Sequence, residues 1–116
     1  MVKETVHEPQ VSDEMFKSVY ITAKDEREAE KIAITLVKER LAACVNIFPI
    51  KSIYRWKGEI QREKEVAMLV KTKDKLINKI IKRVKELHSY KVPCIVSLPI
   101  EKGYTEFLKW IDESTK

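Results

Sequence analysis

Glycine and amide side chains are scarce in this chain. Its 116 residues include two glycines, and four residues carry an amide side chain: Gln10, Asn46, Gln61 and Asn78. A Gly-rich phosphate loop, an HExxH zinc motif and a GxSxG nucleophile motif are all missing. These absences count against the common nucleotide-binding and hydrolytic enzymes. Few amides together with abundant lysine and glutamate resemble the composition of thermophilic proteins.

Long apolar runs are also missing. No stretch approaches the roughly 20 apolar residues that a membrane-spanning helix needs. Residues 1–15 lack the apolar region of a secretory signal, and their composition predicts a flexible tail, so we expect one folded domain over residues 16–116. Cys44 and Cys94 form no CxxC motif, which favours reduced thiols and a cytoplasmic protein.

The charge is high but evenly spread. The chain is 44% hydrophobic and 35% charged, which is typical of a soluble globular domain. The net charge of +5 is distributed along almost every segment, and a nucleic-acid-binding protein more often concentrates it on one face. The apolar run 66–70 has no aromatic residue for stacking on RNA bases. We therefore expect no nucleic-acid partner and no membrane partner.

A long β-hairpin between Arg40 and Lys71 dominates the pattern. Residues 43–56 and 60–72 read as strands on either side of a tight turn at Lys57-Gly58, where glycine supplies a positive φ. The first of these strands would extend about 45 Å, whereas a compact domain of this size is roughly 35 Å across. The hairpin is therefore predicted to project from its own domain.

The remaining elements give the fold class. Residues 16–23 and 94–100 read as strands, and helices are expected from the capping pair Asp25 and Glu28, from Asp74, and over residues 105–114. The order βαββαβ with a C-terminal helix predicts an α+β, ferredoxin-like sandwich with an antiparallel sheet. Its second strand lies at a sheet edge, which suits Pro49 because proline lacks an amide donor.

A long apolar edge strand needs a cover. Ile47, Ile50 and Ile53 recur along the edge strand, and an open edge of this kind invites aggregation. Pairing with further copies of the chain in a closed ring would remove the open edges. The alternative is a monomer whose hairpin curls over its own core.

Three segments carry a resemblance to a known family. They are VYITAKDEREAEKIA, RLAACVNIFPIKSIYRWKGEIQREKEV and ELHSYKVPCIVSLPIEKGYTEFLKWI, and together they span about residues 18–115. In combination they resemble the CutA divalent-cation tolerance protein family. The resemblance implies a ferredoxin-like fold, a tight homotrimer with strands pairing between subunits, and a shape related to PII signalling proteins.

His88 and Glu65 are the candidate metal ligands. The resemblance places the histidine of the LHSY motif at a cleft between subunits, where imidazole suits copper or zinc. Glu65 lies on the third strand and is expected to approach it. The alternatives are a histidine satisfied by a carbonyl at the helix end and a surface glutamate paired with lysine. Some relatives carry a cysteine where this chain has Ile21, which weakens a copper site here.

Six residues are candidates for lining an intersubunit pocket for a small anionic ligand: Arg40, Tyr54, Trp56, Lys71, Tyr90 and Trp110. Arg40 and Lys71 are expected near this pocket because of the resemblance to the family. The alternative role of the aromatic residues is to anchor the subunit interface, where tryptophan and tyrosine are favoured.

These observations predict a non-enzymatic, cytoplasmic, homotrimeric protein that binds divalent cations such as copper or zinc and requires no cofactor. A PII-like sensor of a nucleotide or another small anion is the alternative. An acylphosphatase-like enzyme on the same fold is disfavoured because residues 22–26, TAKDE, provide acidic side chains and no glycine after the first strand.

Overall fold

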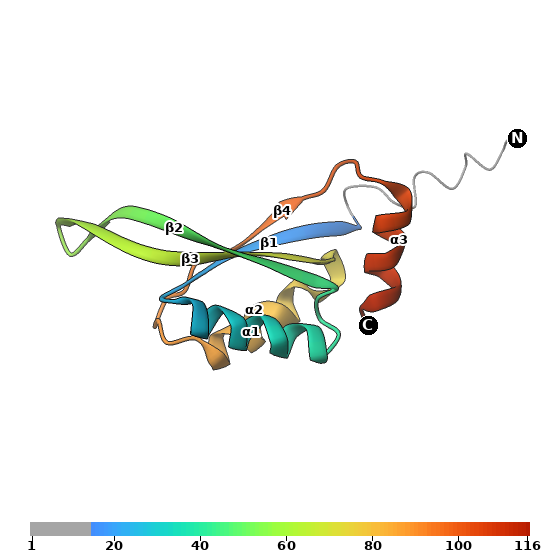
Figure 1. The fold of residues 1–116 in the computed structure, drawn as a ribbon, viewed down its shortest axis with the longest axis horizontal. Helices are drawn as coiled ribbons and strands as arrows, with labels where there is room; N and C mark the ends of the chain where they lie inside the picture. The colour runs from blue at the N-terminus through green and yellow to red at the C-terminus, as the bar shows by residue number, and fades with distance from the viewer. Residues whose placement is uncertain (1–14) are drawn as a thin grey trace, which may run out of the picture.

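The computed structural model describes residues 15–116, so nearly all of the predicted tail over residues 1–15 lies outside the described residues. The elements along the chain are β1 (Phe16–Ala23), α1 (Glu26–Lys38), β2 (Cys44–Trp56), β3 (Glu59–Lys73), the 3-10 turn η2 (Asp74–Leu76), α2 (Ile77–Leu87), β4 (Ile95–Pro99) and α3 (Thr105–Ser114). Helices α1 and α2 cover one face of a single sheet, and α3 lies at the end of the molecule away from the hairpin tip (Figure 1).

The sheet has four antiparallel strands in the order β2-β3-β1-β4. This arrangement is the one expected for two interleaved βαβ units, and the α+β, ferredoxin-like prediction is confirmed. Strand β2 lies at an edge, as Pro49 suggested.

The core fills the space between the sheet and the helices α1 and α2. Alternate residues of the central strands are fully buried there, among them Val19, Ile21, Met68 and Val70. Burial of each such side chain stabilises the folded state by about 1.5–3 kcal/mol. A smaller cluster under α3 consists of Phe16, Ala43, Leu108 and Ile111.

The two predicted helix starts differ in outcome. Asp25 caps α1, since its Oδ1 accepts a 2.8 Å hydrogen bond from the N–H of Glu28. Asp74 does not cap α2: it opens the 3-10 turn, and the α-helix begins at Ile77. The Asp74 carboxylate lies 3.8 Å from Nζ of Lys17 on β1 and makes no capping bond, so that predicted start was wrong by three residues.

The hairpin gives the molecule its elongated shape. The chain measures 59 × 27 × 22 Å, and the tip of β2 and β3 projects at the far left of Figure 1. Both turn residues adopt positive φ, 51° at Lys57 and 81° at Gly58. Only Gly58 was expected to do so. Two left-handed residues in succession match the right-handed twist of the strands.

The sheet face opposite α1 and α2 carries apolar side chains. Cross-strand register places Val96, Tyr20, Leu69 and Asn46 in one row, and directly opposed residues of an antiparallel sheet point to the same face. Val96 is 49% exposed. Residues 15–116 of one chain therefore leave much of this sheet face uncovered.

Within residues 15–116, no helix combines the length and the apolar character needed to cross a membrane.

Candidate functional site

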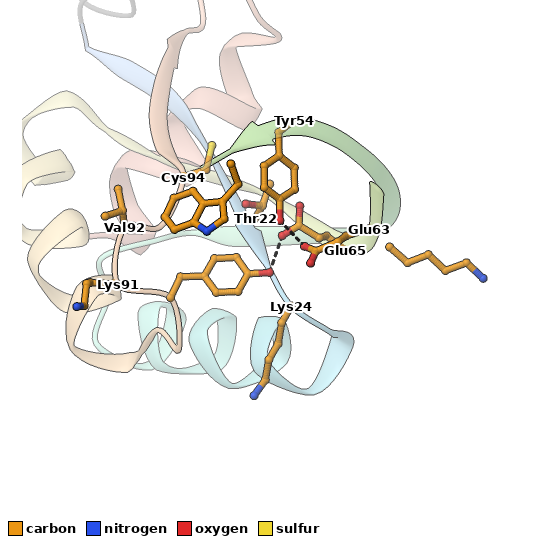
Figure 2. Close-up of a pocket in the computed structure, with 11 residues that line it drawn as sticks. Thr22, Lys24, Tyr54, Glu63, Glu65, Lys91, Val92 and Cys94 are labelled. Carbon is orange, nitrogen blue, oxygen red and sulfur yellow. Dashed lines mark hydrogen bonds between the residues drawn. The ribbon is translucent and has the colours of Figure 1, made fainter. Parts of the chain in front are cut away.

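A cavity of about 740 Å³ lies where the hairpin leaves the body of the domain. Its walls come from four places in the chain: Thr22 at the end of β1, Tyr54 and Trp56 on β2, Glu63 and Glu65 on β3, and residues 90–92 after α2. In Figure 2, the side chains of Tyr54, Glu63 and Glu65 point toward one another. Segments distant in the sequence thus build one pocket.

Two tyrosine hydroxyls hold two carboxylates in this pocket. The hydroxyl of Tyr54 donates to Oε1 of Glu63 at 2.7 Å, and that of Tyr90 donates to Oε2 of Glu65 at 2.6 Å (Figure 2). The bond to Glu63 raises the pKa of Tyr54, and burial together with the bond to Glu65 raises the pKa of Tyr90 well above its usual range. Both phenols therefore stay protonated at neutral pH and act as donors.

Each carboxylate keeps one oxygen without a hydrogen-bond donor among residues 15–116: Oε2 of Glu63 and Oε1 of Glu65. No ion pair joins either group to a lysine or arginine in this part of the chain. Lys24 and Lys91 do line the pocket, but their ammonium groups point away from the carboxylates in Figure 2. The pocket thus presents two anionic groups with free acceptor capacity.

His88 lies behind this pocket. Its side chain is fully buried, its Nε2 lies 2.7 Å from the carbonyl oxygen of Thr22, and its Nδ1 accepts a 3.0 Å hydrogen bond from the N–H of Tyr90. Because Nδ1 is the acceptor, Nε2 carries the proton and donates to Thr22. Both ring nitrogens are thus engaged by the backbone, and metal ligation by His88 would require one of these bonds to break.

Glu28 ties the same segment to α1. Its carboxylate accepts from the N–H of Lys24 at 3.0 Å and from the N–H of Ser89 at 2.7 Å. Burial opposes its ionisation, but these backbone hydrogen bonds outweigh that effect and lower the pKa of Glu28. The sequence indicated Glu28 only as a helix-capping residue. The structure shows that it also anchors the loop that carries Tyr90.

Four of the predicted site residues meet at the pocket: Tyr54, Trp56, Glu65 and Tyr90. The contact expected between Glu65 and His88 is replaced by the hydrogen bond from Tyr90. Glu63 was missed, although it stands two residues before Glu65 and period-two alternation places both on one face of the strand.

The other three predicted pocket residues do not line this cavity. Arg40 donates from Nη2 to the carbonyl of Glu113 at 2.9 Å, and Lys71 donates to Oδ1 of Asn46. Trp110 stacks on Phe107 with ring centroids 5.6 Å apart. A role for these residues at a cleft between subunits stays a prediction.

The described residues of one chain do not bring a full set of metal ligands together. Residues 15–116 contain no group of three or more His, Cys, Asp or Glu side chains that could hold a metal ion. Cys44 and Cys94 are free thiols, and Cys94 borders the pocket. Ile21 is buried in the core, so the first strand supplies no thiolate. Besides the Cys94 thiol, the pocket offers a cation the carboxylate oxygens of Glu63 and Glu65.

Comparison with known proteins identifies relatives over nearly the whole domain. The family model described as CutA1 divalent ion tolerance protein matches residues 17–114. The divalent-cation tolerance protein CutA of Archaeoglobus fulgidus is 50% identical over 102 residues, which cover 88% of this chain and all of the relative. The corresponding Thermus thermophilus protein is 51% identical over 102 residues, with 87% and 99% covered.

Solved structures of the same relatives share the fold of this chain. A structure described as the periplasmic divalent cation tolerance protein CutA from Archaeoglobus fulgidus superposes with a TM-score of 0.87 at 50% identity, covering 88% of this chain and all of that one. The Thermus thermophilus protein gives a TM-score of 0.86 at 50% identity, with the same coverage. The match by family model, sequence and fold shows that this chain belongs to the CutA1 divalent ion tolerance protein family.

Proposed function

We propose that this protein is a non-enzymatic, cytoplasmic homotrimer that confers tolerance to divalent cations by binding them at a cleft between subunits. The observation that carries the proposal is that Glu63 and Glu65 share one pocket and form no ion pair with a lysine or arginine of residues 15–116. Membership of the divalent ion tolerance family supports the cation class. Copper and zinc are the metals proposed.

The shape of the subunit supports assembly. The hairpin makes the described part of the chain more than twice as long as it is wide, at 59 against 27 Å. No strand of residues 15–116 pairs with the outer edge of β2. The sheet face opposite α1 and α2 exposes Val96 and Leu98 by 49% and 45%. A closed ring of three copies covers such faces and edges together.

The donor set supports a site shared between subunits. A divalent ion takes four or more ligands, and one chain offers the free oxygens of Glu63 and Glu65. Water or a neighbouring subunit supplies the rest. His88 can join the ligand set only if its ring loses the hydrogen bond to Thr22 or to Tyr90. We therefore propose that Glu65 contributes more to metal binding than His88 does.

The protonation of Tyr54 and Tyr90 supports a binding role for the pocket rather than a catalytic one. The raised pKa values of Tyr54 and Tyr90 keep their hydroxyls protonated and pointed at carboxylates. A general acid or base works best when its pKa lies near the working pH. The free thiols of Cys44 and Cys94 agree with a reducing, cytoplasmic location.

A second candidate is a PII-like sensor of a small anion. The observation that favours it is the presence of Lys24, Lys64 and Lys91 along the pocket. An anion would also face Glu63 and Glu65, and like charges at close range disfavour binding. A thermal-shift screen of nucleotides against copper and zinc separates the two functions: stabilisation by nucleotides and not by metals would support the sensor.

Calorimetric titration tests the leading proposal. Copper or zinc ions are titrated into the wild type, Glu65→Gln and Glu63→Gln, with Glu101→Gln as a control of equal charge change outside the pocket. We expect roughly tenfold weaker binding for Glu65→Gln, because a charged ligand group is lost, and no change for Glu101→Gln. Equal binding by all four proteins would reject the carboxylate site. Light scattering of each sample gives the oligomeric state.

A further inference from the structure

We propose that this pocket accepts an organic ammonium ion, in particular a short aliphatic diamine. The inference rests on the proposed cation-binding role of Glu63 and Glu65 and specifies a cation class other than a metal. It depends on four properties of the pocket: its size, its aromatic walls, its charge and the spacing of its two carboxylates.

The size exceeds what a bare metal ion requires. The cavity measures about 740 Å³, and sites for small organic molecules are typically about 300–1,000 Å³. A metal site instead gathers several donors around one point, and residues 15–116 contain no such group of three. The space therefore suits a molecule with a carbon chain.

The pocket walls suit both the ammonium group and the carbon chain of an organic amine. Tyr54, Trp56 and Tyr90 contribute aromatic rings, and Val92 contributes an exposed apolar surface. Aromatic faces attract ammonium groups. The chain already shows this affinity, because Nζ of Lys57 lies 5.9 Å from the centroid of the Trp56 ring. Methylene groups of a ligand would pack on the same surfaces.

The charge selects a cation with N–H donors. Glu63 and Glu65 each accept one hydrogen bond from a tyrosine, and the other oxygen of each has no donor among residues 15–116. An alkylammonium group offers three N–H donors to such acceptors. The pocket lysines form no ion pair with either carboxylate within residues 15–116, and the ammonium groups of Lys24 and Lys91 point away in Figure 2.

The spacing of the carboxylates favours two ammonium groups. Residues two apart on one strand face the same side, with Cα atoms about 6.6 Å apart. A four-carbon diamine can place one ammonium group near Glu63 and the other near Glu65. A monoamine of equal length reaches only one of them. The same argument predicts that 1,4-diaminobutane binds more tightly than butylamine.

Calorimetry of the full-length protein tests this inference with 1,4-diaminobutane, butylamine and zinc chloride as separate titrants. We expect the diamine to bind roughly tenfold more tightly than butylamine, since it gains a second charged contact. Trp56→Leu should weaken diamine binding about threefold, through loss of the aromatic face. Glu63→Gln and Glu65→Gln should each weaken it roughly tenfold, while Glu101→Gln leaves it unchanged.

The outcomes separate this inference from the proposed metal function. Zinc binding without diamine binding would overturn the diamine proposal and leave the metal function standing. Diamine binding without metal binding would do the reverse. Equal affinity for diamine and butylamine would reject the bridging of the two carboxylates. Tyr90→Phe keeps the ring and removes the bond to Glu65, and unchanged diamine binding there would show that the tyrosine hydroxyl does not position the carboxylate.

Discussion

Nε2 of His88 lies 2.7 Å from the carbonyl oxygen of Thr22, which joins the end of α2 to the end of β1 across 66 residues of sequence. The opposite ring nitrogen accepts from the N–H of Tyr90. The imidazole is thus a buried connector between the sheet and the loop that positions Tyr90 at the pocket.

His88→Ala should lower the free energy of unfolding by about 2–4 kcal/mol. The substitution leaves a cavity and removes the donor for Thr22 and the acceptor for Tyr90. Urea denaturation of the wild type and the variant measures the loss. Unchanged stability would contradict the structural role of His88 and would restore it as a free candidate for metal binding.

Asp25→Ala should destabilise the protein by about 1 kcal/mol, because its side chain caps α1 at the N–H of Glu28. Asp74→Ala is the matched control. Its carboxylate makes no capping bond and only a 3.8 Å ion pair with Lys17, so the expected change stays within about 0.5 kcal/mol. Equal losses in both variants, measured by urea denaturation, would contradict the assigned cap.

The ion pair between Glu39 and Arg83 should make stability depend on pH. Arg83 donates from Nε and Nη2 to the Glu39 carboxylate, and these hydrogen bonds lower the pKa of Glu39 from its usual value of 4.5. Ionised Glu39 therefore stabilises the fold above about pH 4.5, and this contribution is lost as the pH falls through the lowered pKa.

Glu39→Gln isolates that contribution. The wild type should be more stable than the variant near pH 7, and the difference should shrink below about pH 4.5. Added salt should reduce the difference at neutral pH, because the pair is partly exposed. A difference that is constant from pH 3 to pH 7 would exclude the ionised pair as its source.

Leu98→Lys should disrupt the proposed trimer. Leu98 is 45% exposed on the uncovered sheet face, and a buried lysine without a partner is costly at an interface. Ile34→Lys is the control, since Ile34 is 55% exposed on α1, on the opposite side of the sheet. Light scattering should find a smaller species for Leu98→Lys alone. Trimers in both variants would show that this sheet face is not the interface.

Local signals in the sequence were sufficient for the architecture. Period-two alternation predicted the strands, and the second strand was predicted to begin one residue before its observed start at Cys44. Asp25 predicted the start of α1 because its capping partner is only three residues away. Asp74 misled because the chain first forms the 3-10 turn Asp74–Leu76, so that α2 begins at Ile77 without a side-chain cap.

The pocket was only partly predictable because contacts between segments distant in the sequence build it. The sequence indicated Tyr54 and Trp56 as candidate pocket residues and Glu65 as a candidate metal ligand. The bond from Tyr90 to Glu65 joins residues 25 positions apart, and that from Ser89 to Glu28 joins residues 61 apart. Such contacts arise from the path of the loop after α2. A single sequence gives no measure of that path.

The central claim is that the carboxylates of Glu63 and Glu65 form the cation site. The most direct test is a crystal of the full-length protein soaked with zinc, with anomalous diffraction measured at the zinc edge. The account predicts an anomalous peak about 2.0–2.2 Å from a carboxylate oxygen of Glu65. A peak at His88 with Glu65 still bound only to Tyr90, or no peak in this pocket, would contradict it.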